Sequence, residues 1–415
     1  MKTQPYIIAT IVIFTSLTMY LINHNNNNNN TAETFSPTNT KYISGDKFSG
    51  ENLFDEKLSK IVESDYLDKN ISIGSNLINY SEIKAVYSSG WVAGSTSNRT
   101  EMINNINDYG FNAVVLDIKD EAGHLSYDSS VQTAIDIGAS RHMIKDIKEV
   151  LKEFHDNGIY VIGRIVTFKD PTYAEKVKEI SYKKDDGTYW TDKNNNYWPN
   201  PYNRDTWNYP IELAKEAVDL GFDEIQFDYI RFPSSEGKTS QISYGFDSDT
   251  TTKSQVINQF LTKVMDELAD RNVKVSADVF GITTKHSGDY ENIGQDYQAI
   301  ASIVDVICPM VYPSHYGYGN YNISKPDLDP YAIIVESMKD AKVRVSGDTN
   351  TAIVRPYLQD FTATWLGKGN YRVYENDAVL EQIQACYDLK IYSFTLWDPN
   401  NKYCYEALNS AIRID

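Results

Sequence analysis

The sequence predicts an α/β protein whose strands close into a (β/α)8 barrel, and three observations lead to this prediction. From Ile83 onward, short apolar runs alternate eight times with amphipathic helical stretches. The segment Gly221–Pro233 (GFDEIQFDYIRFP) begins with the period-two alternation of a strand. The helical run 211–220 leads directly into it and stops at a glycine, so helix, tight turn and strand form one repeating α/β unit. Eight such units over this length fit a TIM barrel.

Each expected strand is a short run rich in β-branched or aromatic residues, and each expected helix has an apolar face repeating every three to four residues. A doubly wound sheet would need fewer strands and a glycine-rich first turn, which Ser88–Trp91 does not supply. The expected strands are 83–87, 113–118, 160–166, 224–230, 273–279, 304–310, 353–358 and 391–397. The expected helices lie near 99–108, 143–157, 211–220, 254–270, 297–303, 331–341, 377–389 and 403–412.

The amino-acid composition limits the kinds of molecule that the protein is expected to bind. A formal net charge of −18 argues against nucleic acid and against an anionic membrane surface. The 31 tyrosines suit surfaces that stack on flat faces such as sugar rings. The three cysteines are too few and too scattered for a disulfide framework or a zinc site, and the six histidines form no cluster at ligand spacing. We therefore expect neither a metal nor another cofactor.

The first residues predict export. The run Tyr6–Ile22 is apolar and uncharged after Lys2, close to the minimum length of a membrane-spanning helix. No small-residue cleavage site follows it, so we expect an uncleaved signal anchor over 1–24, with cleavage as the alternative. Residues 25–75 are poor in apolar periodicity and are expected to be a linker, which leaves 76–415 as the barrel domain outside the cell membrane.

The longest loop, 169–207, follows the third expected strand. Asp186-Gly187 between tyrosine-rich flanks predicts a small hairpin there. We expect Trp190 and Trp198 to be displayed on this loop at the C-terminal face of the barrel, where active sites of this fold lie. With the long loops after the fourth and sixth strands, they would form an aromatic-walled cleft.

Four motifs, taken with their order, carry a resemblance. They are Ala85–Gly94 (AVYSSGWVAG), Asn112–Gly123 (NAVVLDIKDEAG), Gly221–Pro233 and Ile307–Tyr316 (ICPMVYPSHY). From about Ile83 to the C-terminus the sequence resembles a bacterial family of unknown function that is classed among the glycoside hydrolases and has a TIM-barrel domain. The resemblance implies a glycosidase-like barrel that is usually exported, and it implies no substrate and no catalytic residues.

Successive side chains of a strand point to opposite faces of the sheet. Polar residues at alternate positions near the ends of several strands are therefore expected to point into the barrel. This alternation pairs Gln226 with Asp228, Ser276 with Asp278, and Asp117 with Lys119. Carboxylates from separate strands would thus converge on one end of the barrel.

Glycosidic cleavage needs one protonated and one ionised carboxyl group. Asp228 and Asp278 would stand on adjacent strands, close enough to push their pKa values apart, and we expect them to be the catalytic pair. Asp228 is the essential carboxylate, and whether it is the acid or the nucleophile stays open. Arg164 would either hold one carboxylate ionised or hold a substrate hydroxyl.

Structural explanations compete with these roles. Asp117, Asp120 and Asp398 are equally compatible with turn caps, and Arg164 with a buried counter-ion. His315 fits a wall residue better than a metal ligand, since no second histidine lies at ligand spacing. The expected substrate-binding residues are Asp117, Arg164, Trp190, Trp198, Gln226, Arg231, Tyr312, His315 and Trp397.

These observations together predict a membrane-anchored glycoside hydrolase that acts outside the cell on a polysaccharide. A non-catalytic glycan-binding barrel is the alternative, because fold does not fix function and no glutamate was found at a strand end. A deacetylase is disfavoured, since that chemistry usually needs a His/Asp metal set.

Overall fold

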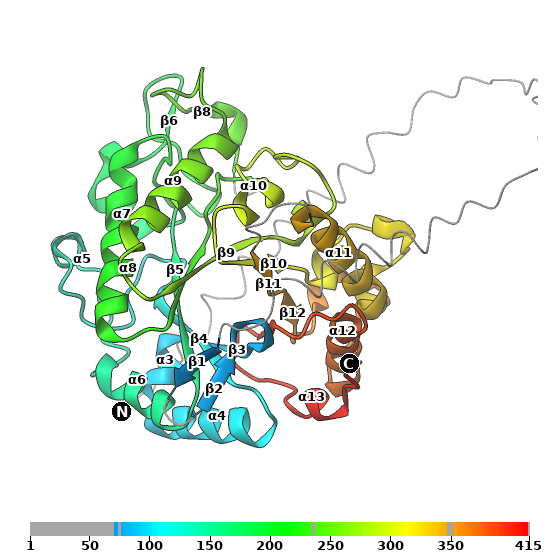
Figure 1. Ribbon diagram of the computed structural model, residues 1–415. Coiled ribbons are helices and arrows are strands. Elements are labelled where there is room, and N and C mark those ends of the chain that lie inside the picture. Colours follow the sequence, from blue (N-terminus) through cyan, green and yellow to red (C-terminus); the bar gives the residue numbers. More distant parts are fainter. Residues whose placement is uncertain (1–69, 74–75, 235–236, 347–351, 414–415) are drawn as a thin grey trace, which may run out of the picture.

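The computed structural model describes residues 70–73, 76–234, 237–346 and 352–413, and its centre is a closed parallel barrel (Figure 1). Each strand pairs with its neighbour in register, and the ring closes where β13 pairs with β3 and where β10 pairs with β9. All eight predicted strands are present, most of them within two residues of the expected limits. In order around the barrel they are β3 (Lys84–Ser88), β4 (Ala113–Lys119), β5 (Tyr160–Val166), β7 (Glu224–Asp228), β9 (Lys274–Phe280), β10 (Val306–Met310), β11 (Ile353–Val354) with β12 (Tyr357–Gln359), and β13 (Phe394–Trp397).

One position of the barrel is filled by two short strands. The predicted strand 353–358 is interrupted at Arg355-Pro356, because proline has no N–H to donate to the ladder. β11 and β12 both pair with β10, and β12 also pairs with β13. The break therefore leaves the ring closed.

Helices surround the barrel (Figure 1). One large apolar cluster fills the layer between helices and strands, and a second, smaller cluster lies inside the barrel. Each predicted helix overlaps a helix of the structure. The helices are α3 (Gly90–Gly94), α4 (Thr96–Asp108), α5 (Gln132–Ile137), α6 (Ile147–Asp156), α7 (Pro171–Lys176), α8 (Asn208–Leu220), α9 (Lys253–Leu268), α10 (Tyr297–Ala301), α11 (Pro330–Val345), α12 (Asn376–Asp388) and α13 (Glu406–Ser410).

A short antiparallel hairpin closes the N-terminal end of the barrel. It consists of β1 (Asn70–Ile73) and β2 (Asn76–Asn79), which the sequence pattern does not predict. Ile73 and Ile78 are 5% and 4% exposed and belong to the apolar cluster inside the barrel. Tyr80, directly after the hairpin, contacts the ring of Tyr160 at the first position of β5. The hairpin thus acts as a floor that keeps water out of this end.

The long loop after β5 contains the hairpin that Asp186-Gly187 predicts. Lys184 N–H donates to the Thr188 carbonyl at 2.7 Å, and Gly187 has a φ of +81°, which favours glycine at this turn. β6 (Lys183–Lys184) also pairs with β8 (Ile242–Ser243) from the loop after β7. In Figure 1 these two strands lie at the top, beyond the ends of α7 and α9.

β4 contains a register shift that corrects one prediction. Asp117 pairs with Arg164 and Lys119 with Ile165, so one residue of β4 bulges between them. Asp117 points into the barrel, whereas the Lys119 ammonium pairs with Asp170 at 2.6 Å and lies over the Tyr209 ring of α8. The expectation that Asp117 and Lys119 share a face is therefore wrong.

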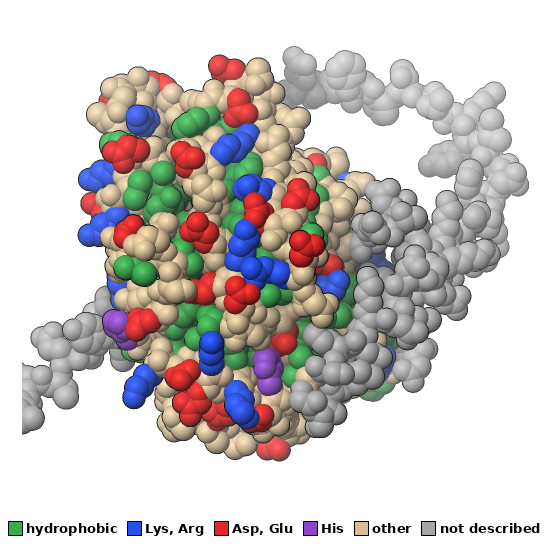
Figure 2. Space-filling view, turned by 60° about the vertical axis from the view of Figure 1, so that its left-hand side comes forward, with side chains coloured by type: hydrophobic (Ala, Val, Ile, Leu, Met, Phe, Trp, Pro, Cys, Tyr) green, Lys and Arg blue, Asp and Glu red, His purple; other side chains and the backbone are tan. Residues whose placement is uncertain are grey.

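The outer surface is mixed in charge. Figure 2 shows acidic and basic side chains interspersed with small hydrophobic areas on one side of the barrel. Across the described ranges, no helix combines the length and the apolar character needed to cross a membrane. The predicted anchor, Tyr6–Ile22, lies outside the described residues.

Candidate active site

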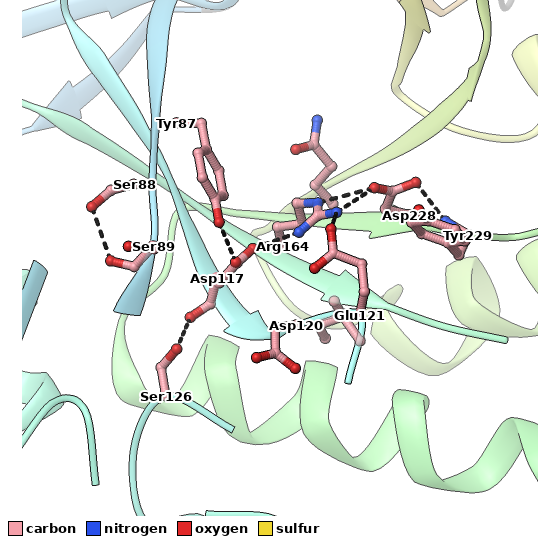
Figure 3. Close-up of polar contacts among 12 residues, drawn as sticks. Tyr87, Ser88, Ser89, Asp117, Asp120, Glu121, Ser126, Arg164, Asp228 and Tyr229 are labelled. Atoms are coloured by element: carbon pink, nitrogen blue, oxygen red, sulfur yellow. Dashed lines mark hydrogen bonds and ion pairs between the residues drawn. The ribbon is translucent and has the colours of Figure 1, made fainter. Parts of the chain in front are cut away.

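Arg164 is the centre of a charged network at the end of the barrel where the strands have their C-termini, which we call the mouth (Figure 3). Its Nη1 donates to Asp117 Oδ1 at 2.7 Å. Its Nε and Nη2 both donate to Asp228 Oδ2, at 3.0 and 2.6 Å. The strand register explains this, because Val166 of β5 lies beside Asp228 and Arg164 lies beside Asp117. One buried guanidinium therefore holds carboxylates from the strands on both sides of β5.

Asp228 is fixed from its backbone as well. The N–H of Tyr229 donates to Asp228 Oδ1 at 2.5 Å. Tyr229 has a φ of +51°, a left-handed conformation that is uncommon for a bulky residue. Such strain persists only where the surroundings impose it, and it is frequent at functional sites. β7 ends at Asp228 because the chain turns at this residue.

Asp278 lies beside Asp228 without a cation of its own. The register of β7 with β9 pairs Phe227 with Ala277, so the next residues on the two strands are Asp228 and Asp278. Asp278 is 1% exposed, and its Oδ1 has no hydrogen-bond partner in the described part of the structure. Burial raises the pKa of Asp278 well above its usual value, and the charge of Asp228 raises it further. Both effects favour the protonated form of Asp278.

Asp117, like Asp278, is a carboxyl group with a raised pKa. Burial raises its pKa to about 7, although the charge of Arg164 acts in the opposite direction. The hydroxyl of Tyr87 donates to Asp117 Oδ2 at 2.6 Å. The turn-cap explanation does not apply to Asp117, because its side chain faces the network. It does apply to Asp120 and Asp398, which accept from backbone N–H groups of the turns that follow them.

Glu121 also belongs to the network, although it is not among the site residues predicted from the sequence. Its Oε1 accepts from Arg164 Nη2 at 3.2 Å, and its side chain is 32% exposed, the most of the carboxyl groups around Arg164. Burial would raise the pKa of Glu121, but the charges of Arg164 and Lys169 outweigh it and lower the pKa. The available signal was its place in the quoted motif, two residues after the end of β4.

The remaining strand ends give the mouth an aromatic half. β4, β5, β7 and β9 supply the charged groups, and β10, β12, β13 and β3 follow them around the ring. Trp397 packs on Tyr87 with 4.1 Å between ring centroids, and the Arg164 guanidinium lies 5.4 Å from the Trp397 ring. Tyr312 contacts Phe361 from the next strand end. We call β10, β12, β13 and β3 with these rings the aromatic half, and the other four strand ends the polar half.

His315 lies in the aromatic half. Its Nδ1 is 2.9 Å from the hydroxyl of Ser314, and its ring contacts Tyr312. Burial lowers the pKa of His315 to about 4, so the ring is neutral at physiological pH. Within the described ranges, no group of three or more His, Cys, Asp or Glu residues is placed to hold a metal ion.

The structure corrects the expectation for Trp190 and Trp198. Both rings are buried, at 1% and 0% exposure, rather than displayed on their loop. Trp190 Nε1 donates to the Lys238 carbonyl, and Trp198 Nε1 donates to Asp192. The Trp190 ring packs against Gly237 and Lys238 of the loop after β7, which helps to bury it. The Trp198 ring still contacts the Tyr229 ring edge-on, so it packs against the strained residue.

Two other residues that were predicted to contact substrate, Gln226 and Arg231, are buried and bonded within the protein. Gln226 is fully buried, and both ends of its amide are used inside the barrel: Tyr357 hydroxyl donates to Oε1 at 2.6 Å, and Nε2 donates to Cys308 Sγ. The Arg231 guanidinium, 3% exposed, donates to the Phe232 carbonyl and lies over the rings of Trp198, Tyr229 and Phe280. Both residues therefore pack within the protein beside the carboxyl groups, and their contact with substrate stays a prediction.

Comparison with known proteins assigns the chain to a family. A family model described as "Putative glycosyl hydrolase domain" matches residues 85–403. The chain belongs to this family. The resemblance seen in the four motifs is thereby confirmed, and so is the expected enzyme class, glycoside hydrolase. No significant match was found among curated proteins.

Three solved structures are similar to this chain, and two of them have TM-scores above 0.5. A hypothetical protein from Ruminiclostridium thermocellum is 43% identical over 47% of this chain and 97% of its own, with a TM-score of 0.43. The PgaB (BpsB) glycoside hydrolase domain from Bordetella bronchiseptica is 11% identical, with 80% of this chain and 99% of that chain covered and a TM-score of 0.53. Alpha-L-fucosidase isoenzyme 2 from Paenibacillus thiaminolyticus is 14% identical over 80% and 48%, with a TM-score of 0.52. At these identities the last two show the fold alone.

Proposed function

We propose that the protein hydrolyses glycosidic bonds of an extracellular or cell-wall polysaccharide, with Asp278 as the acid and Asp228 as the ionised carboxylate. The observation that carries this proposal is the unequal distribution of positive charge. Arg164 donates twice to Asp228, whereas Asp278 on the adjacent strand is buried and its pKa is raised by that burial and by the charge of Asp228. Glycoside hydrolysis requires such a pair in opposite protonation states.

The chemistry follows from these states. Asp278 would give its proton to the glycosidic oxygen, so that the leaving sugar departs as an alcohol. Asp228 would stabilise the positive charge that develops on the sugar ring, or attack it directly. Asp278 Oδ1 and Trp397 Nε1 are buried polar atoms without a hydrogen-bond partner in the described residues. A bound sugar would satisfy both, since buried polar atoms are rarely left unpaired.

A second candidate is a barrel that binds glycans without cleaving them. It is favoured by the saturation of Asp228, whose two oxygens accept from Arg164 and from the Tyr229 N–H. A carboxylate engaged in this way is a weaker nucleophile than a free one. The two candidates share the ligand and differ in whether a bond breaks.

Release of reducing ends from peptidoglycan and from a panel of bacterial exopolysaccharides separates the two candidates. We expect release by the parent and at least a hundredfold loss in Asp228→Asn and in Asp278→Asn. Asp136→Asn, on the exposed face of α5, is the matched control and should keep full activity. Binding by all four proteins with no release from any glycan would establish the binding module instead.

We also propose that the barrel works outside the cell membrane, held by the segment 6–22. This rests on the apolar, uncharged sequence of that segment and on the absence of a small-residue cleavage site after it. Fractionation of cells making the full chain should place it in the membrane fraction, and protease added to intact cells should digest the barrel. A shorter protein in the medium would show cleavage instead.

A further inference from the structure

Trp91 differs from the other tryptophans in its environment. Trp190, Trp198, Trp207 and Trp397 are buried, and Trp365 is partly buried against the interior cluster. Trp91 is 64% exposed. Exposure of an indole sacrifices the large stabilisation that its burial would give, so its position needs an explanation other than packing.

The short helix that carries Trp91 is held rigidly. A Cβ at Gly90 would overlap Ser126, and one at Gly94 would overlap the backbone of Met143, so α3 packs directly onto both segments. At its start, the N–H and the hydroxyl of Ser89 each bond Asn401 Oδ1 at 3.0 Å. The indole is therefore presented on a fixed support, which lowers the entropy lost when a ligand binds.

This support is coupled to the active site. Ser126, against which Gly90 packs, donates its hydroxyl to the Asp117 carbonyl at 2.6 Å (Figure 3). Tyr87, which binds the Asp117 carboxyl group, lies on β3 four residues before Trp91. Four residues span at most about 14 Å of extended chain, so Trp91 lies close to the mouth on the β3 side.

The aromatic half would thus continue beyond the buried rings. Trp397 and Tyr87 stand at the ends of β13 and β3, which are neighbours in the barrel, and Trp91 follows β3. The faces of sugar rings carry C–H groups that pack on aromatic faces, while their hydroxyl groups remain free for water or polar side chains. A row formed by Trp397, Tyr87 and Trp91 would suit a ligand that has several sugar units in line.

We propose that Trp91 forms an outer sugar-binding subsite, which takes a sugar unit of a polysaccharide a short distance from the bond that is cleaved. This inference rests on the proposed function, and it adds that the substrate is a chain longer than the two sugars at the cleavage point. Short oligosaccharides would not reach the indole, and long ones would.

Trp91→Ala tests the subsite by its dependence on chain length. With oligosaccharides prepared from a glycan that the parent cleaves, we expect kcat/KM to fall roughly three- to tenfold for long chains and to be unchanged for short ones. Trp91→Phe should restore part of the loss. Phe246→Ala is the matched control, because Phe246 is 65% exposed on the loop after β7, in the polar half.

Retardation in native gels that contain peptidoglycan or each exopolysaccharide of the panel tests binding separately from cleavage. In the Asp228→Asn background, loss of retardation in the Trp91→Ala protein alone supports the subsite. Equal retardation with and without the indole, or equal loss of kcat/KM for short and long chains, would overturn it and leave the hydrolase intact. Absence of both retardation and cleavage with every glycan would overturn the subsite and the hydrolase together.

Discussion

Arg164 bonds two of the aspartates at the mouth, Asp117 and Asp228, and makes no hydrogen bond to Asp278. Its five N–H donors lie in a fixed plane, which lets one side chain bond Asp117 and Asp228 at once. Asp278 receives no such bond, and burial raises its pKa well above the ordinary value. The set of carboxyl groups that Arg164 bonds therefore depends on the shape of the guanidinium as much as on its charge.

Replacement of Arg164 by lysine tests this dependence. Lysine keeps the charge but cannot reach both carboxylates in one plane, so we expect the rate of reducing-end release to fall at least a hundredfold. Circular dichroism should show a folded barrel. Arg204→Lys, at an exposed ion pair with Asp247, is the control and should change neither property. Full activity in Arg164→Lys would mean that charge alone matters.

Asp278 should make stability depend on pH. A folded pKa above the unfolded one means that the folded state holds the proton more tightly, so stability is lost as pH rises from the ordinary value of 3.8 through the raised folded value. Asp278→Asn removes this loss. We expect the variant to melt at about the same temperature as the parent at pH 4 and roughly 2–4 °C higher at pH 8, while losing activity. A constant difference across this range would contradict the protonation state proposed for Asp278.

At the scale of the element, the loop after β5 shows how buried polar groups hold an irregular segment. Asp192 accepts from the N–H groups of Asn194 and Asn196 and from the indole of Trp198. Trp198 in turn contacts Tyr229, the strained residue next to Asp228. The loop is therefore connected to the active site through one ring.

Asp192→Ala should loosen this connection. Loss of the acceptor leaves buried donors unpaired, which costs about 1–3 kcal/mol. Hydrogen exchange should speed up in residues 192–200, and the rate of reducing-end release should fall. Asp186→Ala removes a similar turn acceptor at the exposed tip of the same loop and should leave exchange near Trp198 unchanged. The same exchange pattern in both variants would show that Trp198 is held by packing alone.

The elements of the barrel were predictable because each strand has one or two buried faces. Period two and apolar content identify such strands from sequence alone. The hairpin β1–β2 was not predictable, since its strands are four residues each and lie in a polar stretch. The exposure of Trp190 and Trp198 was predicted wrongly because composition does not show which side of a loop another segment covers. Glu121 was missed because it follows the bulge in β4, where alternation no longer indicates direction.

At the scale of the whole molecule, the acidic composition should govern solubility. The sequence has a net charge of −18 at pH 7 and a pI near 4.8. Repulsion between molecules disappears at the pI, so light scattering from a concentrated solution should peak near pH 4.8 and decrease on both sides. Added salt should flatten this profile. Scattering that rises steadily down to pH 3 would point to acid unfolding as the cause.

The hairpin floor also decides where the folding unit begins. The family match starts at residue 85, and a protein shortened to that limit would lack both β1 and β2. Water would then enter beside the ion pair of Glu224 and Arg355, whose side chains are fully buried between the strands. A gene fragment chosen by family similarity alone would therefore yield a barrel that lacks the hairpin at its N-terminal end and aggregates. A fragment that begins before Asn70 would keep the hairpin.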